Sequence, residues 1–206
     1  MKKSLIVAGM LLVGTSVMAQ ELNDSGKWFA GIGMFNGSGT ETAAAPVSGS
    51  TISVSAEADY DASSVPVTIG YVDKRNNRLK LSYSKIDVDW DDGDSDSATG
   101  FDFNYDFTLE SIKSESLLPY IGIGIGFYNA DNTAQYYVDG EDLKGVSSNL
   151  SLGLLYSINS NVEIEAAYSI KHIKWQDTSV YSGSTRIDVS MEEDISGLYA
   201  GINYKF

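Results

Sequence analysis

The chain has 206 residues, no cysteine, a single histidine and a formal net charge of −14. The absence of cysteine excludes disulfides and thiolate sites, and one histidine leaves little support for a histidine-rich metal site. The acidic balance argues against nucleic acid as a partner, because phosphates require a basic surface.

The first residues have the pattern of a secretory leader. A charged start, Met1-Lys2-Lys3, precedes a mostly apolar run from Leu5 to Val17 and the small residue Ala19. The run is shorter than the roughly 20 apolar residues of a spanning helix, so an uncleaved anchor is the weaker alternative. We expect residues 1–19 to be a cleaved signal peptide and residues 20–206 to form one domain. Cleavage leaves 12 basic and 28 acidic residues, a net charge of −16.

Eight later stretches alternate between apolar and polar or small residues, which predicts β-strands with one apolar face. Each is close to the roughly 9–11 residues that a tilted strand needs to cross a bilayer. In chain order they cover residues 27–37, 64–71, 78–90, 101–109, 119–128, 146–156, 162–171 and 197–206. In the third stretch the apolar positions change phase between Tyr83 and Ile86, which predicts a bulge near Ser84 and Lys85.

The connections between these strands alternate in length. Short polar turns are predicted around Asn76, Ser114 and Ser160. Longer loops are predicted at residues 36–63, 91–98, 129–145 and 176–184. Such asymmetry is typical of membrane barrels, with short periplasmic turns and long extracellular loops, and it predicts that both termini are periplasmic.

Alternation alone also fits a soluble, lipocalin-like barrel, so the composition of the two faces must decide. The polar face is rich in Gly, Ser, Ala and Asn, whereas a water-exposed wall would carry scattered Lys and Glu. The apolar face carries aromatic residues where strands would reach an interface, which favours contact with lipid. These expected girdle residues are Trp28, Tyr71, Phe107, Tyr156, Tyr204 and Phe206.

An eight-stranded barrel is only wide enough for side chains, so we expect a packed interior. Charged side chains enclosed there need partners. We predict ion pairs between Lys80 and Asp106, and between Lys205 and Glu163 or Glu165. A plug that stabilises the barrel is the preferred interpretation, and a gated conductance is the alternative.

The last ten residues carry a family resemblance. Gly201, Tyr204 and Phe206 fit the pattern of a Gly, two free positions, an aromatic residue, one free position and a terminal aromatic residue. This resembles the C-terminal assembly signal of bacterial outer-membrane β-barrels. With the strand count and loop asymmetry, the chain resembles the small outer-membrane β-barrel family, similar to the transmembrane domain of outer-membrane protein A and to outer-membrane protein X.

The resemblance implies an all-β, eight-stranded, antiparallel up-and-down transmembrane β-barrel in the outer membrane. It also implies that the partners are outer-membrane lipid, lipopolysaccharide and the barrel-assembly machinery. No peptidoglycan-binding domain is expected after the barrel. The implied function is a non-enzymatic surface protein whose loops contact an extracellular ligand or support the envelope. The alternative is a narrow channel or a conduit for small or hydrophobic molecules.

Two motifs that could take part in binding or catalysis give only weak signals. Asp87–Asp96 is acidic, but the calcium-loop pattern fails at Asp92 and Ala98, so a solvated loop is preferred to weak divalent binding. Gly122–Gly126 lacks the spacing and the following helix of a dinucleotide site. We expect no cofactor and no metal site.

His172 is the only candidate for a catalytic base. The resemblance implies a comparison with outer-membrane proteases and lipid acylases, which need an acidic residue or a serine beside the histidine. Residues 170–174 supply neither, and Ser169, three positions away, would lie on the opposite face of a strand. We therefore expect an interfacial histidine and no enzyme.

Overall fold

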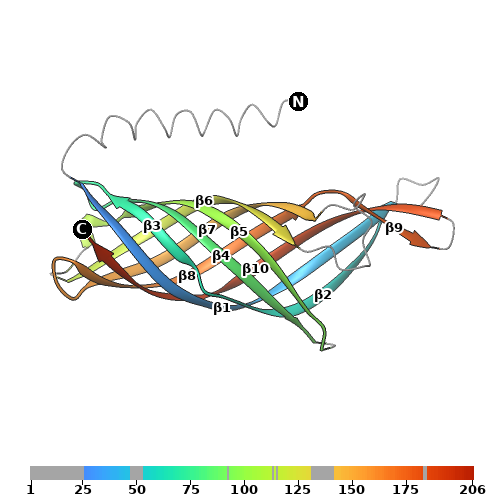
Figure 1. Ribbon diagram of the computed structural model, residues 1–206, viewed down its shortest axis with the longest axis horizontal. Coiled ribbons are helices and arrows are strands. Elements are labelled where there is room, and N and C mark those ends of the chain that lie inside the picture. The colour runs from blue at the N-terminus through green and yellow to red at the C-terminus, as the bar shows by residue number, and fades with distance from the viewer. Residues whose placement is uncertain are drawn as a thin grey trace, which may run out of the picture.

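The computed structural model shows a closed β-barrel with strands that run far beyond one end of the wall (Figure 1). The structure describes residues 26–46, 53–91, 93–112, 114, 116–130, 142–182 and 185–206, with the backbone only for 180–182, 185 and 186. The expected signal peptide, residues 1–19, lies outside these ranges. Within the described part of the chain, no helix is long and apolar enough to span a membrane.

The described residues form ten strands and one 3-10 turn, η1 (Glu110–Ile112). The strands are β1 (Lys27–Pro46), β2 (Ser53–Ser64), β3 (Val67–Val72), β4 (Arg78–Trp90), β5 (Ser95–Thr108), β6 (Leu117–Ala130), β7 (Leu143–Ser157), β8 (Val162–Trp175), β9 (Thr178–Ser182) and β10 (Thr185–Lys205).

Nine of the ten strands fill the eight positions of the barrel wall. β2 and β3 occupy one position, because their register against β1 continues across residues 65–66, with Phe35 opposite Ser64 and Ile32 opposite Val67. β9 pairs only with the start of β10, and β1 closes the ring against β10. The prediction of an eight-stranded antiparallel up-and-down barrel is confirmed.

The turn between β3 and β4 shows why the short connections form where predicted. One carboxylate oxygen of Asp73 accepts hydrogen bonds from the backbone N–H groups of Arg75 and Asn77, each at 2.8 Å. Asn76 adopts φ 60°, a left-handed conformation that asparagine tolerates better than most residues.

The prediction of a long loop over residues 36–63 is wrong. β1 continues to Pro46, and its register with β2 is unbroken from Phe35 opposite Ser64 to Pro46 opposite Ser53. The stretch lacks an apolar period because most of its residues are small or polar, yet the ladder still forms. This hairpin projects at the end of the barrel opposite to the start of β1 and the end of β10 (Figure 1).

The predicted bulge near Ser84 and Lys85 is also wrong. The β4–β5 register runs without interruption from Arg78 opposite Asp106 to Asp89 opposite Ser95. Ser84, Ile86 and Val88 are all buried on the inner face. The change of phase is therefore a change in which face carries the apolar residues, and the backbone alternates throughout.

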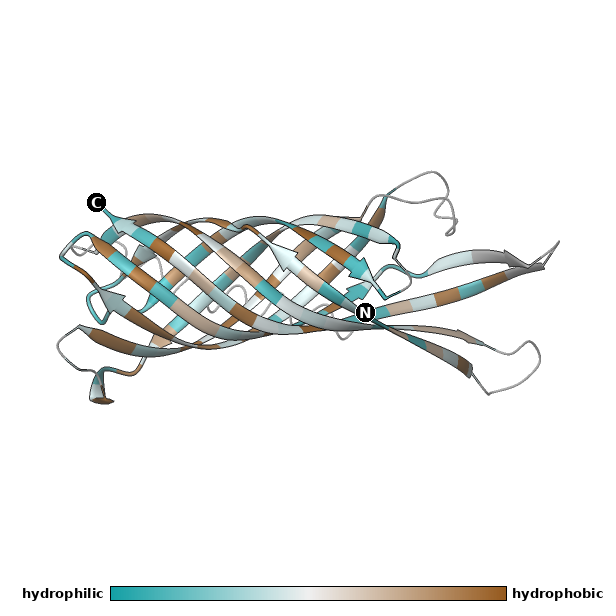
Figure 2. Cartoon of the chain, turned by 90° about the horizontal axis from the view of Figure 1, so that it is seen from below, coloured by the Kyte–Doolittle hydropathy of each residue, from teal (hydrophilic) through white to brown (hydrophobic). Residues whose placement is uncertain are grey.

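Hydrophobic and hydrophilic residues alternate along the strands (Figure 2). The exposure of these residues divides the wall into two zones of opposite polarity. In the first, the apolar band, apolar side chains point outward: Phe103, Ile123 and Leu152 are 48%, 50% and 62% exposed. Asn104 and Gly124, by contrast, face the lumen, where a Cβ on Gly124 would meet the Asn104 side chain. Outward apolar residues end along one edge of the band, at Met34, Val65, Tyr83, Phe101, Phe127, Val146, Ile170 and Leu198.

Beyond that edge lies the outer extension, which comprises the remaining ends of β1, β2 and β4–β10. Its outward residues are mostly polar, such as Lys85, Asp87 and Asn129, and its inward residues are mostly apolar. At the opposite edge of the band the expected girdle residues Trp28, Phe107, Tyr156, Tyr204 and Phe206 are exposed. Tyr71 is the exception, because it packs edge-on against Trp28 and its hydroxyl accepts a hydrogen bond from the Gly26 N–H.

Candidate functional site

The barrel interior at the level of the apolar band holds a buried charge network. Lys80 on β4 places its Nζ 2.8 Å from Asp106 Oδ2 on β5 and 2.9 Å from Glu165 Oε1 on β8. Glu165 also accepts hydrogen bonds from the Tyr120 hydroxyl at 2.6 Å and from Asn203 Nδ2 at 3.0 Å. The predicted neighbours Lys80 and Asp106 therefore lie together, with Glu165 as a second partner.

A second set of charges extends this network toward the chain termini. Arg78 donates to Glu163 and lies over the Phe29 ring, with its Cζ 5.2 Å from the ring centre. Lys205 Nζ lies 3.1 Å from Glu163 Oε2, and of the two acidic partners predicted for Lys205 it is Glu163 that it contacts. The network fills the lumen at this end and balances most of its charge internally.

A separate polar group closes the other side of the band. Asp102 on β5 accepts hydrogen bonds from the Tyr128 hydroxyl at 2.5 Å and from Asn149 Nδ2 at 2.8 Å, and it pairs with Lys171 Nζ at 2.8 Å. The Lys171 ammonium also lies 4.4 Å from the centre of the Tyr128 ring. Asp102 thereby holds β5, β6, β7 and β8 together across the lumen.

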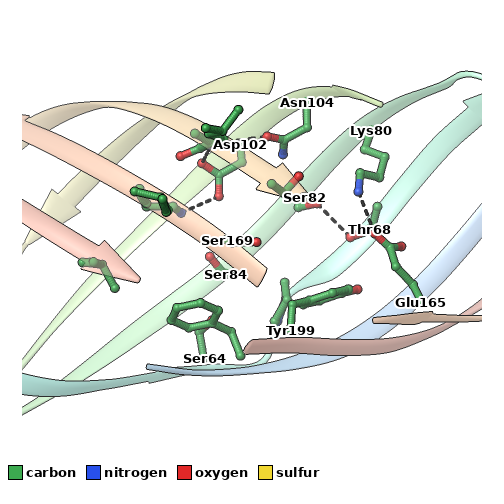
Figure 3. Close-up of a pocket in the computed structure, with 18 of the residues that line it drawn as sticks. Ser64, Thr68, Lys80, Ser82, Ser84, Asp102, Asn104, Glu165, Ser169 and Tyr199 are labelled. Atoms are coloured by element: carbon green, nitrogen blue, oxygen red, sulfur yellow. Dashed lines mark hydrogen bonds and ion pairs between the residues drawn. The ribbon is translucent and has the colours of Figure 1, made fainter. Parts of the chain in front are cut away.

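Between the two groups lies a cavity of about 120 Å³, lined by both polar and apolar residues (Figure 3). Eight of its twenty lining residues carry a hydroxyl group, and the hydroxyls of Thr68 and Ser82 are 2.8 Å apart. Lys80 and Glu165 bound one end and Asp102 bounds the other. A cavity of this volume can hold several water molecules.

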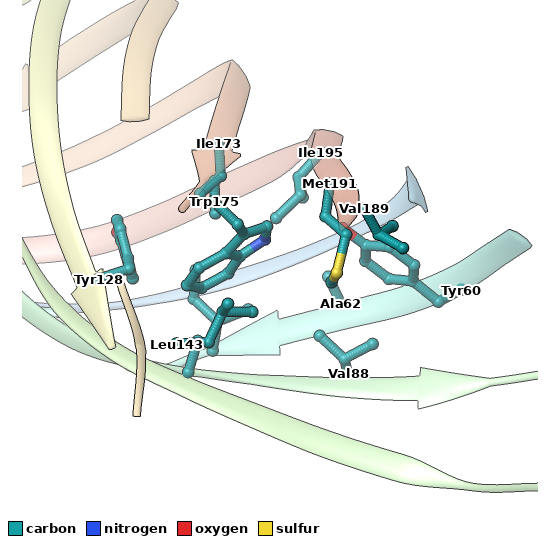
Figure 4. Packing of buried hydrophobic residues seen from close by; sticks show 12 residues of the cluster. Tyr60, Ala62, Val88, Tyr128, Leu143, Ile173, Trp175, Val189, Met191 and Ile195 are labelled. Carbon is teal, nitrogen blue, oxygen red and sulfur yellow. The ribbon is translucent and has the colours of Figure 1, made fainter. Parts of the chain in front are cut away.

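Inside the outer extension the lumen is filled by apolar side chains (Figure 4). We call this cluster the apolar plug; it comprises Tyr60, Ala62, Ile86, Val88, Ala98, Tyr128, Leu143, Ile173, Trp175, Val189, Met191 and Ile195. Its residues come from strands on all sides of the extension. The plug therefore gives the extension a core of its own above the apolar band.

Two glutamates lie within the extension beside the plug. Glu193 accepts hydrogen bonds from the Tyr60 hydroxyl at 2.9 Å and from Trp175 Nε1 at 2.7 Å. Glu41 lies directly opposite Glu193 in the β1–β10 ladder. Burial, with the neighbouring Glu193 as a second cause, raises the pKa of Glu41 to about 7, and burial also raises the pKa of Glu193.

On the outer surface, His172 has partners that its sequence neighbours did not reveal. Its Nδ1 lies 2.8 Å from Asp194 Oδ1, and Asp194 is its directly paired residue on β10. On the other side, the directly paired residue on β7 is Ser148. The interpretation from residues 170–174 missed both, because cross-strand neighbours follow from register.

The remaining sequence-predicted residues lie apart from the interior network. Gly201 pairs with Gly33 at the β1–β10 seam, where a Cβ would come 2.4 Å from the Tyr199 hydroxyl. Tyr204 and Phe206 point outward at the girdle, and the Phe206 N–H donates to Trp28 O at 2.9 Å. No group of three or more potential metal ligands occurs among the described residues, which leave out Asp92 of the acidic stretch.

Arg78, Asp102 and Lys171 were missed by the sequence analysis. One signal was present: a turn centred on residue 75 places Arg78 on the same face of β4 as Lys80. Asp102 likewise shares its face with Asp106. Their partners on β8 depend on how the whole barrel closes, which no local pattern records.

Comparison with known proteins agrees with this architecture. The sequence matches no protein-family model and no curated protein. Among solved structures, the outer membrane protein OprG from Pseudomonas aeruginosa aligns with a TM-score of 0.53 at 12% identity, covering 86% of this chain and 96% of OprG. The chain has the fold of the small outer-membrane β-barrels.

Two further structures complete the comparison. The outer membrane protein AlkL aligns with a TM-score of 0.55 at 15% identity, covering 88% of this chain and 90% of AlkL. The outer membrane protease OmpT from Escherichia coli aligns at 9% identity with a TM-score of 0.41, covering 88% of this chain and 98% of OmpT. That last similarity is too low to bear on activity, and the first two concern the fold alone.

Proposed function

We propose that the protein is an integral outer-membrane barrel with a closed lumen, whose function resides on its outer wall and outer extension. The apolar band supports membrane insertion, because large apolar side chains are exposed around the whole ring at one level. In this proposal both termini are periplasmic and the outer extension is extracellular. Lipid and lipopolysaccharide are then its nearest partners.

The proposal of a closed lumen is based on the side chains that fill the lumen at both ends. The network of Arg78, Lys80, Asp106 and Glu165 occupies the lumen near the termini, and the apolar plug occupies the extension. The cavity between them, at about 120 Å³, spans only part of the barrel. Polar routes for hydrated ions are blocked by apolar side chains on one side and by paired charges on the other.

Planar bilayer recording tests the closed lumen. The full chain, refolded in detergent and shown to be folded by its altered gel mobility before boiling, should give no steady conductance steps. Reproducible steps of uniform size would contradict the proposal. Release of the protein from cells by osmotic shock alone would contradict its membrane location.

A conduit for apolar molecules is a second candidate, favoured by the apolar plug. An apolar ligand would meet Trp175, which is buried in the plug with Ile173 and Met191. Titration with a brominated alkane should then quench tryptophan fluorescence to a saturating level, and Trp175→Phe should abolish the saturable part. Linear quenching that is equal in both proteins would rule this candidate out.

A further inference from the structure

A serine, a histidine and an aspartate form one continuous row on the outer wall. Ser148 on β7 is directly opposite His172 on β8, and His172 is directly opposite Asp194 on β10. All three side chains face outward: the His172 side chain is 41% exposed, that of Asp194 is 75% exposed, and Ser148 is exposed. The three residues therefore share one face and one paired row of the sheet, with Ser148 just inside the edge of the apolar band and His172 and Asp194 just beyond it.

The order of the row matches the roles of a nucleophile, a base and an orienting carboxylate. Asp194 Oδ1 lies 2.8 Å from His172 Nδ1, which directs Nε2 away from Asp194. Directly paired residues in an antiparallel sheet have Cβ atoms about 4.5–5.5 Å apart. Nε2 therefore points toward β7, where a change of side-chain rotamer is needed for Ser148 Oγ to meet it, and such contacts commonly tighten only when substrate binds.

The surroundings of Ser148 indicate the kind of substrate. Its neighbours on the same face of β7, Val146 and Leu150, are exposed apolar residues of the apolar band, and so is Leu152 one step further. The residue paired with Ser148 on β6 is Ile125, which also belongs to the band. A hydroxyl group set among lipid-facing side chains at the edge of the band meets acyl chains and the ester groups near their ends.

A groove that begins at Val146, two residues from Ser148 along β7, adds positive charge. It has a volume of about 460 Å³ and is lined by the ends of β6, β7 and β8, including Phe127, Val146, Lys144 and Lys174. The exposed side chains of Phe127 and Val146 form an apolar floor, and the two lysines lie on the outward face beyond it. Apolar surface next to ammonium groups complements a lipid that carries a phosphate.

We propose that Ser148, His172 and Asp194 form an ester-hydrolysing site on the outer wall, acting on acyl esters of phosphorylated lipids in the outer leaflet. The proposal rests on the proposed membrane orientation and departs from the expectation that the protein is not an enzyme. Ser148 is the nucleophile and His172 the base. Asp194 is a positioning residue that acts through His172.

The reaction needs only the ester and water. Ser148 Oγ attacks the ester carbonyl carbon while its proton passes to His172 Nε2. The intermediate expels the alcohol part of the lipid, which takes the proton from His172, and leaves an acyl-serine. Water then attacks the acyl-serine, His172 takes its proton and returns it to Ser148 Oγ, and a fatty acid leaves.

The oxyanion of the intermediate needs a hydrogen-bond donor. The backbone N–H groups near Ser148 are engaged, because β7 pairs with β6 on one side and β8 on the other. Lys174 lies two residues beyond His172 on the same face of β8, opposite Val146, which makes its ammonium the nearest cation in register. It contacts Glu192 at 2.6 Å, so Glu192→Gln should release it and raise the rate.

The first experiment uses a fluorophosphonate probe on the full refolded chain in detergent micelles, with the modified residue located by peptide mass spectrometry. The probe should label Ser148 in the wild type and fail to label it in His172→Gln. The matched control is Ser196→Ala, because Ser196 is paired with Ile170 rather than with a histidine. Absence of Ser148 labelling in the folded wild type would overturn the proposal.

The second experiment measures fatty acid release from vesicles of phosphatidylglycerol and of phosphatidylcholine. Ser148→Ala should lower kcat by about a thousandfold or more, as loss of a nucleophile does elsewhere. Lys144→Gln should raise KM for phosphatidylglycerol about fivefold with kcat unchanged, the usual effect of one lysine near an anionic surface. Asp194→Asn should lower kcat, and Asp194→Glu should restore part of it.

Each variant is first checked for folding by its gel mobility before and after boiling. Turnover by folded Ser148→Ala at the wild-type rate would refute the site, and so would a wild type that releases no fatty acid. These results would leave the closed lumen and the membrane location intact, because bilayer recording and fractionation test those separately.

Discussion

Lys80→Met tests whether the interior network stabilises the barrel. Lys80 contacts two carboxylates, Asp106 at 2.8 Å and Glu165 at 2.9 Å, and Asp106 is fully buried. After the substitution Glu165 keeps its hydrogen bonds from Tyr120 and Asn203. The loss therefore falls mainly on Asp106, which would be buried without an ion pair.

Removing one partner of a buried ion pair typically costs about 3–5 kcal/mol. We expect about 3 kcal/mol for Lys80→Met, the lower end, because Asp106 can take up a proton and become neutral. The double variant Lys80→Met/Asp106→Asn should lose less than Lys80→Met alone, since no uncompensated charge remains. The difference gives the coupling between the two residues.

Urea unfolding in detergent micelles, followed by tryptophan fluorescence, measures these losses as shifts of the midpoint at constant slope. The matched control is Lys85→Met, which removes an exposed lysine 2.5 Å from Asp87. Exposed pairs contribute about 0–1 kcal/mol, so this variant should unfold close to the wild type. A loss for Lys80→Met no larger than that for Lys85→Met would refute a stabilising role of the network.

Three further predictions concern the extension, the apolar band and the terminal strand. Burial raises the pKa of Glu41 to about 7 in the folded protein, against about 4.5 when unfolded. Stability should therefore fall as pH rises across this interval, by about 1–2 kcal/mol because Glu41 is only partly buried. Glu41→Gln should make the urea midpoint depend less on pH, and an unchanged dependence would contradict this. Leu152→Arg should destabilise the barrel in bilayers by about 2–4 kcal/mol although Leu152 is exposed, whereas Asn129→Arg in the outer extension should cost little; equal costs would place the apolar band outside lipid. Deleting Phe206 should lower the heat-modifiable, folded fraction in the outer membrane while refolding of purified protein in detergent stays normal; an undiminished folded fraction in cells would argue against an assembly role for Gly201, Tyr204 and Phe206.

The wall of the barrel was predictable because its signal is local. Alternation with a period of two needs only neighbouring residues, and it placed Phe103 and Leu152 outside and Asn104 inside. The Lys80 and Asp106 contact was within reach for the same reason, since β4 and β5 are neighbours in sequence. Lys80 is an inward position near the start of β4 and Asp106 one near the end of β5, which lie at the same end of the barrel because the two strands are antiparallel.

The outer extension was not predicted from the sequence, because its polarity is the reverse of that in the apolar band. The change between Tyr83 and Ile86 looks like a bulge when one face is assumed to stay apolar. The phase change itself marks where the apolar band ends, but it has that meaning only once β4 is known to continue without a bulge to Trp90. Small residues from Asn36 to Pro46 obscured the alternation further, so β1 and β2 were taken for a loop.

Part of the row formed by Ser148, His172 and Asp194 could have been predicted from the sequence. The predicted tight turn around Ser160 fixes the β7–β8 register, and a hairpin centred there places Ser148 opposite His172. Asp194 was not accessible in this way, because β8 and β10 are joined through a longer segment that contains β9. Its pairing with His172 follows only once the barrel is closed.

The reversal of polarity along single strands helps to select the correct strand register during assembly. A slip by one residue would turn serine and glycine toward lipid and, on the same strand, turn Lys85 and Asp87 into the plug, so the error is penalised at both levels. A slip by two residues keeps each residue type on its correct face and would cost little in a wall of uniform polarity. Here a slip by two residues would move the polarity change of one strand out of line with that of its neighbours. The position of this change along each strand therefore helps to fix its register.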